Sequence, residues 1–366
     1  MVKKAKEKFY TLDNILKKKA TYNIIIGMRS NGKTYSCLKY AIDEYFKTGG
    51  QFAYIRRWRE DVIGRRANGV FTALNDDGYI IDASKGKFDG ICYYAGRFYF
   101  CTYDEKGKPI YNDCDLFGYT FALADNEHNK SISFNRVKTV FFDEFISKRM
   151  YLNDEFVLFM NTLSTIIRQR NDVKIFMAGN TINKYAPYFE EMGLTHVPKM
   201  EQGTIDLYTY GDSELTVAVE YCAEISRKNS NKYFAFNNPK LHMITSGKWE
   251  LDFYPHLFQK YKPENILFIY FIIFNNEIYQ AEIIKIDDYY FTYIHIKTSP
   301  LKDLENDLIY DVAEFNPKLN HSQSIFKPIN KLQQKILWFF VNNRVCYQNN
   351  SVGNAISNCL LQMKSV

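Results

Sequence analysis

The sequence lacks the marks of a membrane protein and of a secreted, disulfide-linked protein. Its longest apolar run, residues 266 to 274, is less than half of the about 20 residues that a membrane-spanning helix needs. The basic N-terminus is followed by polar residues instead of an apolar stretch, so no signal peptide is expected. The seven cysteines include no C-x-x-C pair, which argues against a disulfide framework and a zinc site. We therefore expect a soluble cytoplasmic protein.

The charge of the chain is only moderately one-sided. A net charge of +6 in 366 residues permits contact with a polyanion but does not require it. Basic residues form clusters at Lys3, Lys4, Lys6 and Lys8, at residues 17 to 19, at Arg56, Arg57 and Arg59, and at Arg65 and Arg66. Each cluster by itself is more often a solvated face than a nucleic-acid site. The 17% aromatic content could serve base stacking, but core packing is the simpler interpretation.

The first part of the chain alternates between strand and helix patterns. An apolar, β-branched run at residues 22 to 26 is followed by helical spacing at 34 to 46 and by a second strand at 52 to 55. Further strands are expected at 119–123, 137–142 and 173–178, a hairpin around Gly96 at 86–104, and a helix through Phe156, Met160, Leu163 and Ile167. Strand, helix, strand is the beginning of a parallel α/β sheet. We expect an α/β domain at residues 1–199 with a sheet of about five strands.

The rest of the chain has a different pattern. Residues 200–262 hold short strand-like pieces interrupted by prolines, and we expect a connecting or lid segment there. Three consecutive strands are then expected at 266–274, 278–286 and 290–296, separated by Asn275-Asn276 and Asp287-Asp288 turns, with a late helix at 332–341. This predicts a small α+β second domain at residues 263–366.

A phosphate-binding loop is the clearest motif. Residues 27 to 34 match G-x-x-x-x-G-K-[ST] at every defined position, between an apolar strand and an amphipathic helix. In such a loop the backbone N–H groups wrap the phosphates, the lysine reaches the β- and γ-phosphates, and the last hydroxyl binds magnesium. We expect ATP to contact the loop and the residue after it, namely Gly27, Arg29, Ser30, Asn31, Gly32, Lys33, Thr34 and Tyr35.

A second motif places two carboxylates after an apolar strand, at Asp143 and Glu144. We expect Asp143, together with Thr34, to hold Mg²⁺, and Glu144 to polarise the water that attacks the γ-phosphate. Strand ends are often acidic, so the pair by itself is weak evidence of a site. It supports a nucleotide site because the chain also contains the phosphate-binding loop. Switch-type and kinase relatives of such loops commonly lack a catalytic glutamate here, which favours an ATPase.

Three further residues have both a functional and a purely structural interpretation. Asn180 ends the next strand, where its amide can sense the γ-phosphate or simply form a turn. Arg168 and Arg170 end the helix that leads towards the catalytic edge of the sheet, where the helix dipole favours arginine anyway. A catalytic arginine would supply charge to a neighbouring subunit's transition state. Arg29, inside the loop, is a rival or an additional phosphate contact.

At these positions the sequence resembles the genome-packaging ATPases of small tailed bacteriophages, which drive double-stranded DNA into a preformed capsid. The resemblance rests on four segments: Ile-Gly-x-Arg-x-x-Gly-Lys at residues 26–33, Phe52 to Arg57, Val140 to Ile146, and Arg168-Gln169-Arg170 ahead of the strand that ends at Asn180. It covers about the first 200 residues, and beyond residue 260 it is a similarity of layout only.

The resemblance implies a P-loop NTPase domain in a homo-oligomeric ring, expected to be a pentamer, with ATP and Mg²⁺ as cofactors. It implies Glu144 as catalytic carboxylate, Arg168 as the finger that acts on a neighbour, and the portal vertex of the procapsid as partner, with transient attachment there in the host cytoplasm. The second domain is implied to be ribonuclease-H-like without nuclease activity, and the first of its expected strands carries no carboxylate for a two-metal site. No membrane partner is expected.

Two alternatives to a DNA-translocating motor stay open from the residues. A strand-separating helicase-type ATPase would prefer single-stranded DNA and would use aromatic stacking in its channel. An ATP-gated nucleic-acid-binding scaffold would act through its bound state and hydrolyse slowly. Glu144 disfavours the scaffold, because a protein that only needs to bind ATP has no use for a residue that activates water.

Overall fold

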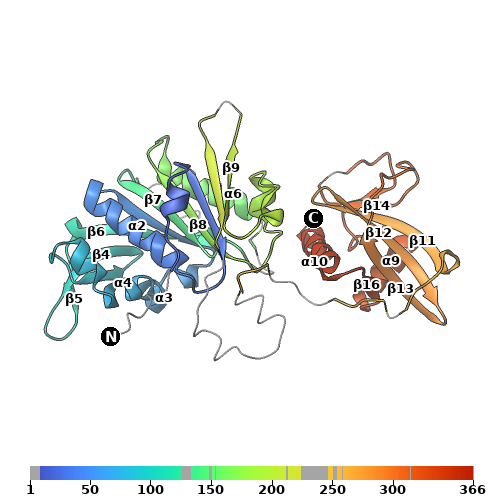
Figure 1. Ribbon diagram of the computed structural model, residues 1–366, viewed down its shortest axis with the longest axis horizontal. Coiled ribbons are helices and arrows are strands. Elements are labelled where there is room, and N and C mark those ends of the chain that lie inside the picture. Colours follow the sequence, from blue (N-terminus) through green and yellow to red (C-terminus); the bar gives the residue numbers. More distant parts are fainter. Residues whose placement is uncertain are drawn as a thin grey trace, which may run out of the picture. The chain divides into compact units, whose positions relative to one another are not determined.

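The computed structural model describes residues 9–125, 133–147, 151–152, 154–211, 213–223, 246–249, 254–257, 259–313 and 315–365. The chain divides into two compact units, Met1–Glu250 and Leu251–Val366, which are described separately (Figure 1). Both are mixed α/β, each with one main sheet. Among the described residues, none of the helices has the length and apolar character to span a membrane.

The first unit contains a ten-stranded sheet in the order β3-β4-β6-β2-β7-β8-β1-β10-β9, with β5 paired to β4. The strands are β1 Tyr22–Gly27, β2 Gln51–Arg56, β3 Gly90–Tyr94, β4 Arg97–Tyr103, β5 Pro109–Ile110, β6 Leu116–Ala122, β7 Val137–Asp143, β8 Lys174–Asn180, β9 Thr204–Thr209 and β10 Thr216–Tyr221. The run β6-β2-β7-β8-β1-β10 is parallel throughout, and antiparallel pairs flank it. The carboxyl ends of β1, β2, β7 and β8 therefore meet at one edge.

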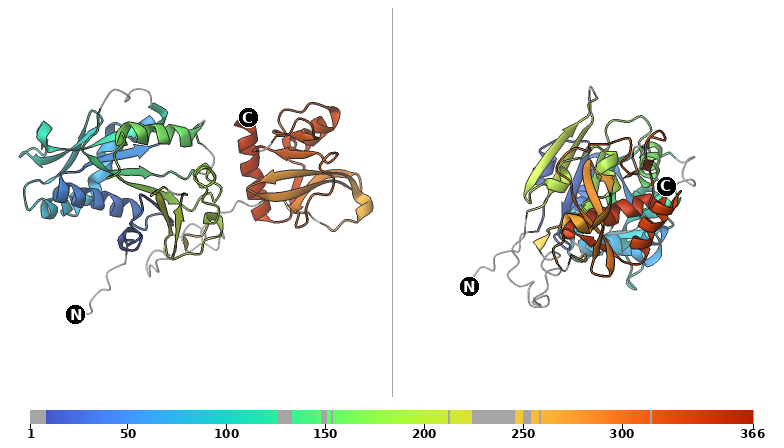
Figure 2. Two further views of the ribbon diagram at one scale, coloured as in Figure 1. Left: turned by 90° about the horizontal axis from the view of Figure 1, so that it is seen from above. Right: turned by 90° about the vertical axis from the view of Figure 1, so that its right-hand side faces the viewer.

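The helices of the first unit cover both faces of this sheet. They are α1 Asp13–Leu16, α2 Lys33–Thr48, α3 Gly64–Asn68, α4 Thr72–Asp76, α5 Tyr79–Ala83, α6 Glu155–Ile167 and α7 Pro187–Glu191, with 3-10 turns at Arg59–Asp61, Gly69–Phe71, Asp113–Asp115 and Val197–Lys199. In β1, Ile24 and Ile26 belong to the core beneath α6, whereas Ile25 belongs to the core beneath α2. Alternating side chains of a strand point to opposite faces, so a continuous apolar run is typical of a strand that is covered on both faces. Figure 2 shows α2 and α6 on opposite sides of the sheet.

The sheet differs from the sequence-based expectation in its size, ten strands instead of about five, and in the segments that build it. The expected strands and the Gly96 hairpin are present, and the hairpin lies at the edge as predicted. However, the segment assigned to a connector at residues 200–262 contributes β9 and β10, and β10 pairs in parallel with β1. Val217, Ala218 and Val219 are buried in that position. The partner of β10 lies about 195 residues earlier in the chain, and local pattern carries no information about so distant a pairing.

The second unit contains a six-stranded sheet in the order β15-β14-β11-β12-β13-β16. Its elements are a 3-10 turn at Pro263–Asn265, β11 Ile266–Phe274, β12 Glu277–Ile286, β13 Tyr289–Ile296, β14 Ile309–Asp311, β15 His321–Ser322, α9 Lys331–Val341, β16 Val345–Tyr347 and α10 Asn350–Ser365. The predicted three-strand meander and late helix are confirmed by β11 to β13 and α9. Asn275 and Asn276 both have positive φ in the first hairpin turn, the conformation that two-residue hairpins favour. The short strands β14 to β16 and helix α10 were not predicted.

Candidate active site

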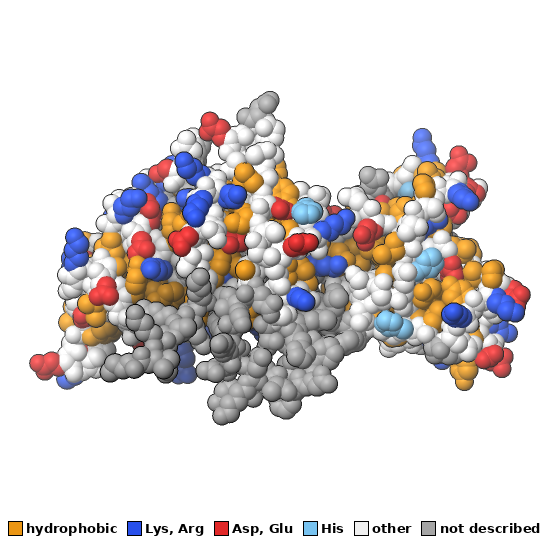
Figure 3. Space-filling model, in the orientation of Figure 1, with side chains coloured by type: hydrophobic (Ala, Val, Ile, Leu, Met, Phe, Trp, Pro, Cys, Tyr) orange, Lys and Arg blue, Asp and Glu red, His pale blue; other side chains and the backbone are white. Residues whose placement is uncertain are grey.

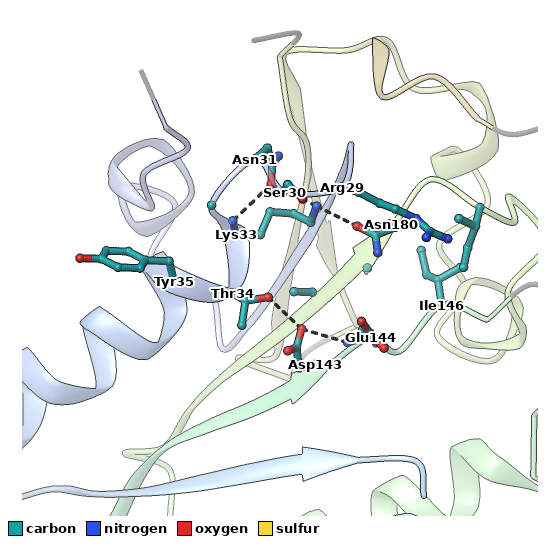
Figure 4. Close-up of a pocket in the computed structure, with 14 residues that line it drawn as sticks. Arg29, Ser30, Asn31, Lys33, Thr34, Tyr35, Asp143, Glu144, Ile146 and Asn180 are labelled. Atoms are coloured by element: carbon teal, nitrogen blue, oxygen red, sulfur yellow. Dashed lines mark hydrogen bonds between the residues drawn. The ribbon is translucent and has the colours of Figure 1, made fainter. Parts of the chain in front are cut away.

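A pocket of about 510 Å³ lies where β1, β7 and β8 end (Figure 4). Three segments line it: the loop and first turn at residues 29–35, Asp143, Glu144 and Ile146 after β7, and residues 178–180 and 182 at the end of β8. The register of the parallel strands explains the convergence, because Gly27 lies opposite Asn180 and Asp143 lies opposite Ala178. Residues more than 100 positions apart in the chain are thereby brought to one edge.

The loop between β1 and α2 depends on two glycines. Gly32 has φ +97°, a left-handed conformation that a side chain disfavours, and it directly precedes the first turn of α2. At Gly27, an added Cβ would lie 2.8 Å from Cβ of Cys222, which follows β10. Ser30 also has positive φ. The backbone of the loop is therefore curled tightly over the N-terminus of α2, where anions are favoured.

The ammonium group of Lys33 lies at the centre of the loop. Its Nζ donates to the carbonyl oxygens of Gly27 at 3.1 Å and Met28 at 2.7 Å. It also donates to Oδ1 of Asn31 at 3.1 Å and to Oδ1 of Asn180 at 3.3 Å. Burial lowers the pKa of Lys33 to about 8, although nearby groups that include Asp143 act to raise it. Anionic phosphates would favour the charged form of this lysine.

Asp143 is the last residue of β7, and its buried carboxylate faces Thr34. The Thr34 hydroxyl donates to Oδ1 at 3.2 Å, the Tyr54 hydroxyl donates to Oδ2 at 3.2 Å, and the backbone N–H of Glu144 donates to Oδ1 at 3.1 Å. Burial raises the pKa of Asp143 and the neighbouring charge of Glu144 adds to this, while Arg56 and the hydrogen bonds from Thr34 and Tyr54 oppose the shift. A hydroxyl and a carboxylate at this separation are suited to share one Mg²⁺, whose preferred ligands are oxygens.

Glu144 presents its carboxylate at the rim of the pocket, with 57% of the side chain exposed. Nη2 of Arg56 contacts Oε2 of Glu144 at 2.6 Å, and Nη1 of Arg56 lies 3.7 Å from Oδ2 of Asp143. Arg56 ends β2, directly beside β7 in the sheet. From the sequence, Arg56 was assigned to a basic cluster and to the Phe52 to Arg57 segment of the resemblance, with no role in the pocket. Its position at the end of a strand was a usable signal, but the neighbour relation of β2 and β7 was needed to interpret it.

The remaining predicted residues of the pocket differ in orientation. Asn180 ends β8 with its amide towards Lys33, and the long side chain of Arg29 extends towards Asn180 and Ile146 (Figure 4). Asn31 accepts from both the backbone N–H and the Nζ of Lys33. The ring of Tyr35 points away from these groups, and its hydroxyl donates to Asp77 at 2.9 Å. Tyr35 can therefore serve the site through its backbone but not through its ring.

The sequence pattern of the Podovirus DNA encapsidation protein (Gp16) family matches residues 4–87 and 92–277. This chain belongs to that family. The DNA packaging proteins of Bacillus phages phi29 and B103 are 26% and 28% identical to it over 189 and 177 residues. These stretches cover 50% and 47% of this chain and 50% and 48% of theirs. The chain thus matches about half the length of these curated relatives.

Two solved structures of packaging motors share the fold of this encapsidation-family protein along nearly the whole chain. The Phi-28 gp11 DNA packaging motor has a TM-score of 0.56 at 18% identity, covering 98% of each chain. The bacteriophage Phi-29 viral genome packaging motor assembly has a TM-score of 0.55 at 19% identity, covering 97% of this chain and 99% of the other. At these identities the likeness establishes shared architecture and not individual residue roles.

Arg168 of this encapsidation-family protein lies away from its own pocket. It is the exposed residue that ends α6, six positions before β8 begins, whereas the pocket lies where β8 ends. Seven strand residues separate the two edges by about 20 Å. The expectation that α6 leads into the catalytic edge is therefore wrong: the helix leads into the opposite edge. Arg170 is committed there to structure, because its guanidinium donates to the carbonyls of Phe134, Ile166, Ile167 and Val137.

The segment before α1 contacts the phosphate-binding loop, which the sequence did not indicate. The backbone N–H of Tyr10 donates to the carbonyl of Asn31 at 2.9 Å, and the Ser36 hydroxyl donates to the carbonyl of Tyr10 at 2.6 Å. The Tyr10 hydroxyl also donates to the carboxylate of Glu220 in β10 at 2.7 Å. In the sequence, Tyr10 follows a lysine-rich arm with no periodic pattern, so nothing local marked it as a site residue.

Proposed function

We propose that this protein is an ATP-hydrolysing motor that translocates double-stranded viral DNA into the procapsid. The observation that carries the proposal is the convergence of Lys33, Thr34, Asp143 and Glu144 in one pocket at the end of a parallel sheet. Membership of the encapsidation family supports DNA as the transported polymer. The first unit, with β9 and β10 included, acts as a P-loop NTPase domain.

Each pocket residue has a role in this proposal. Lys33 and the loop N–H groups would bind the phosphates of ATP, and Thr34 and Asp143 are the residues that would hold Mg²⁺. The bound metal would neutralise charge on the phosphates. Glu144 accepts a proton from the attacking water, and its exposure at the rim leaves the carboxylate accessible to that water. Asn180 and Arg29 line the same pocket and would contact the γ-phosphate (Figure 4).

Arg168 acts on a neighbouring subunit in a ring, which we expect to be pentameric. Its position at the edge opposite to its own pocket supports action across a subunit boundary, because it cannot reach its own site. Arginine fingers in other ATPases and GTPases contribute about 10³ to 10⁵ in rate. The ring attaches transiently to the portal vertex of the procapsid in the host cytoplasm.

The second unit is proposed to be ribonuclease-H-like but without nuclease activity. The order β13-β12-β11-β14-β15, with an antiparallel meander followed by strands parallel to β11, supports this assignment.

Two features support the lack of nuclease activity. The central strand β11 carries no carboxylate. On the next strand, Glu282 already accepts hydrogen bonds from Tyr261 and Gln280 and contacts His295. Incubation with supercoiled DNA and Mg²⁺ or Mn²⁺ should leave the DNA intact, and nicking would contradict the assignment.

The DNA contacts are proposed to be phosphate contacts within the ring. On the face shown in Figure 3, basic and acidic side chains are interspersed over the first unit, so the described residues of this face form no continuous basic track. A motor that accepts any sequence needs contacts to the backbone and not to base edges. Binding of the DNA backbone in the central channel of a ring would accept any base sequence and would not require a basic track on this face.

The test of the proposed function is ATPase activity measured with duplex DNA, single-stranded DNA and no DNA, together with the solution mass. Stimulation by duplex and a ring-sized mass are expected. Stronger stimulation by single strands would favour a helicase-type ATPase instead. Tight ATP binding with negligible turnover under all three conditions would favour an ATP-gated scaffold.

A further inference from the structure

Arg56, the last residue of β2, and Arg57, the residue after it, point to different partners. Arg56 faces the pocket and the carboxylate of Glu144. Arg57 is buried, with only 7% of its side chain exposed, and forms two hydrogen bonds with Glu155, the first residue of α6. Nε contacts Oε2 at 2.6 Å, and Nη2 contacts Oε1 at 2.8 Å. The ring of Tyr151 lies 4.9 Å from the guanidinium carbon.

The carboxylate of Glu155 has all of its acceptor positions occupied. Besides Arg57, Oε1 accepts from the Tyr188 hydroxyl at 2.8 Å and Oε2 accepts from the backbone N–H of Leu152 at 2.8 Å. A buried polar network that is fully satisfied has one favoured arrangement and resists displacement. Glu155 therefore holds the guanidinium of Arg57 in a fixed position and orientation.

Arg57 has further N–H groups that do not bond Glu155, and they donate to backbone carbonyls directly after β7. Nη2 donates to the carbonyl of Phe145 at 2.7 Å, and Nη1 donates to the carbonyl of Glu144 at 3.4 Å. On the other side, the N–H of Glu144 is bound by Asp143. Glu144 itself has φ +56°, a left-handed conformation that is uncommon for non-glycine residues and costs free energy.

We propose that Arg57, oriented by Glu155, is a positioning residue that holds Glu144 in its left-handed backbone conformation and so aims its carboxylate at the pocket. This inference rests on the proposed ATPase function. Arg57 does not touch the nucleotide pocket, so it acts only through the backbone of Glu144 and Phe145. A buried ion pair is weak evidence of added stability by itself, and the two bonds to carbonyls give this pair its specific role.

Arg57→Lys tests the proposal, because lysine keeps the charge but lacks the planar fork that bonds Glu155 and two carbonyls together. In the full chain we expect the affinity for a fluorescent ATP analogue to stay within about twofold, while kcat falls at least tenfold, as for loss of an interaction that matters in the transition state. Hydrogen exchange at the amides of Glu144 and Phe145 should also become faster. A purely structural role would lower the melting temperature without this separation of binding from turnover.

Gln51→Ala is the matched control, since buried Gln51 begins β2 at the edge opposite the pocket and its side-chain amide donates to the backbone carbonyl of Leu116 at 3.1 Å. It should cost stability without a change in kcat per folded molecule. If Arg57→Lys does not fold, Tyr188→Phe removes only one hydrogen bond from Glu155 and should give a smaller loss of kcat with unchanged ATP affinity.

The outcomes separate this inference from the proposed function. If wild-type protein hydrolyses ATP and Glu144→Gln abolishes hydrolysis, yet both Arg57→Lys and Tyr188→Phe retain wild-type kcat, the positioning role is overturned and the ATPase assignment stands. If wild-type protein has no ATPase activity under any condition with DNA, the proposed function fails first. An equal loss of kcat in Arg57→Lys and Gln51→Ala would also overturn the positioning role.

Discussion

At the scale of single residues, the pocket holds the residues proposed to bind ATP and the residue proposed to activate water at different positions. Lys33 and Thr34 are close to the loop backbone and to Asp143, where they can hold phosphates and metal. Glu144 lies beyond them at the rim, in contact with Arg56. Because the two sets occupy different places, removing one should not mimic removing the other.

We predict that Lys33→Ala abolishes ATP binding, whereas Glu144→Gln binds ATP and loses hydrolysis by at least about 100-fold, the scale of general base catalysis. Glutamine keeps the size of the side chain but cannot take a proton from water. Equilibrium binding of a fluorescent ATP analogue and steady-state phosphate release measure the two effects. Equal loss of binding in both variants would rule out the role given to Glu144.

The affinity for ATP should depend on pH through Lys33. Its pKa is lowered by burial to about 8, and bound phosphates would raise it again, so ATP binding above pH 8 requires proton uptake. The charged form is complete well below pH 8, and affinity should fall by up to about tenfold per pH unit above it. Calorimetric titration near pH 8.5 in two buffers of different ionisation enthalpy measures the uptake. Identical heats in both buffers would contradict the prediction.

At the scale of elements, helix α6 connects the surroundings of Glu144 with the proposed arginine finger. It begins at Glu155, which holds Arg57 next to Glu144, and ends at Arg168 on the opposite edge of the sheet. A helix of 13 residues is about 20 Å long and rigid over that length. The proposed finger and the backbone support of the catalytic carboxylate are thus the two ends of one element.

A mixing experiment tests whether Arg168 acts across a subunit boundary. Rings of Arg168→Ala should bind ATP almost normally yet hydrolyse it slowly, because the finger stabilises charge mainly in the transition state. Mixing them with Glu144→Gln rings should restore part of the activity, since only mixed rings place an intact Glu144 beside a neighbour's intact Arg168. No recovery, in rings shown to exchange subunits, would leave Arg168 a structural residue and make Arg29 the better candidate.

At the scale of the whole molecule, the proposed function depends on DNA that moves through a ring of subunits. If the contacts are to phosphates, each neutralised phosphate releases counterions, and affinity falls steeply with salt. We predict a loss of about 10³ or more in duplex affinity between 50 and 200 mM salt, with little dependence on base sequence. Fluorescence anisotropy with two unrelated duplexes of equal length measures both. A flat salt dependence, or a strong preference for one duplex, would count against a translocating motor.

Local sequence pattern was sufficient to predict many strands of the first unit and the central residues of the pocket. Gly27 to Thr34 were identifiable because a phosphate-binding loop needs particular residues at particular positions, and the loop is contiguous. Asp143 and Glu144 were identifiable because they follow an apolar strand. The strands of both units were largely visible for the same reason: burial on one or two faces leaves a periodic or continuous apolar signature.

Only the tertiary structure decided which strand ends are neighbours. The pairing of β2 with β7 brings Arg56 to Glu144, and the pairing of β10 with β1 puts Cys222 against Gly27. The same holds for Arg57, which looked like part of a basic cluster but is buried against Glu155. A local sequence pattern specifies what a residue can do and which face it occupies. Contacts between distant segments depend on sheet order, and the packing of the whole unit determines that order.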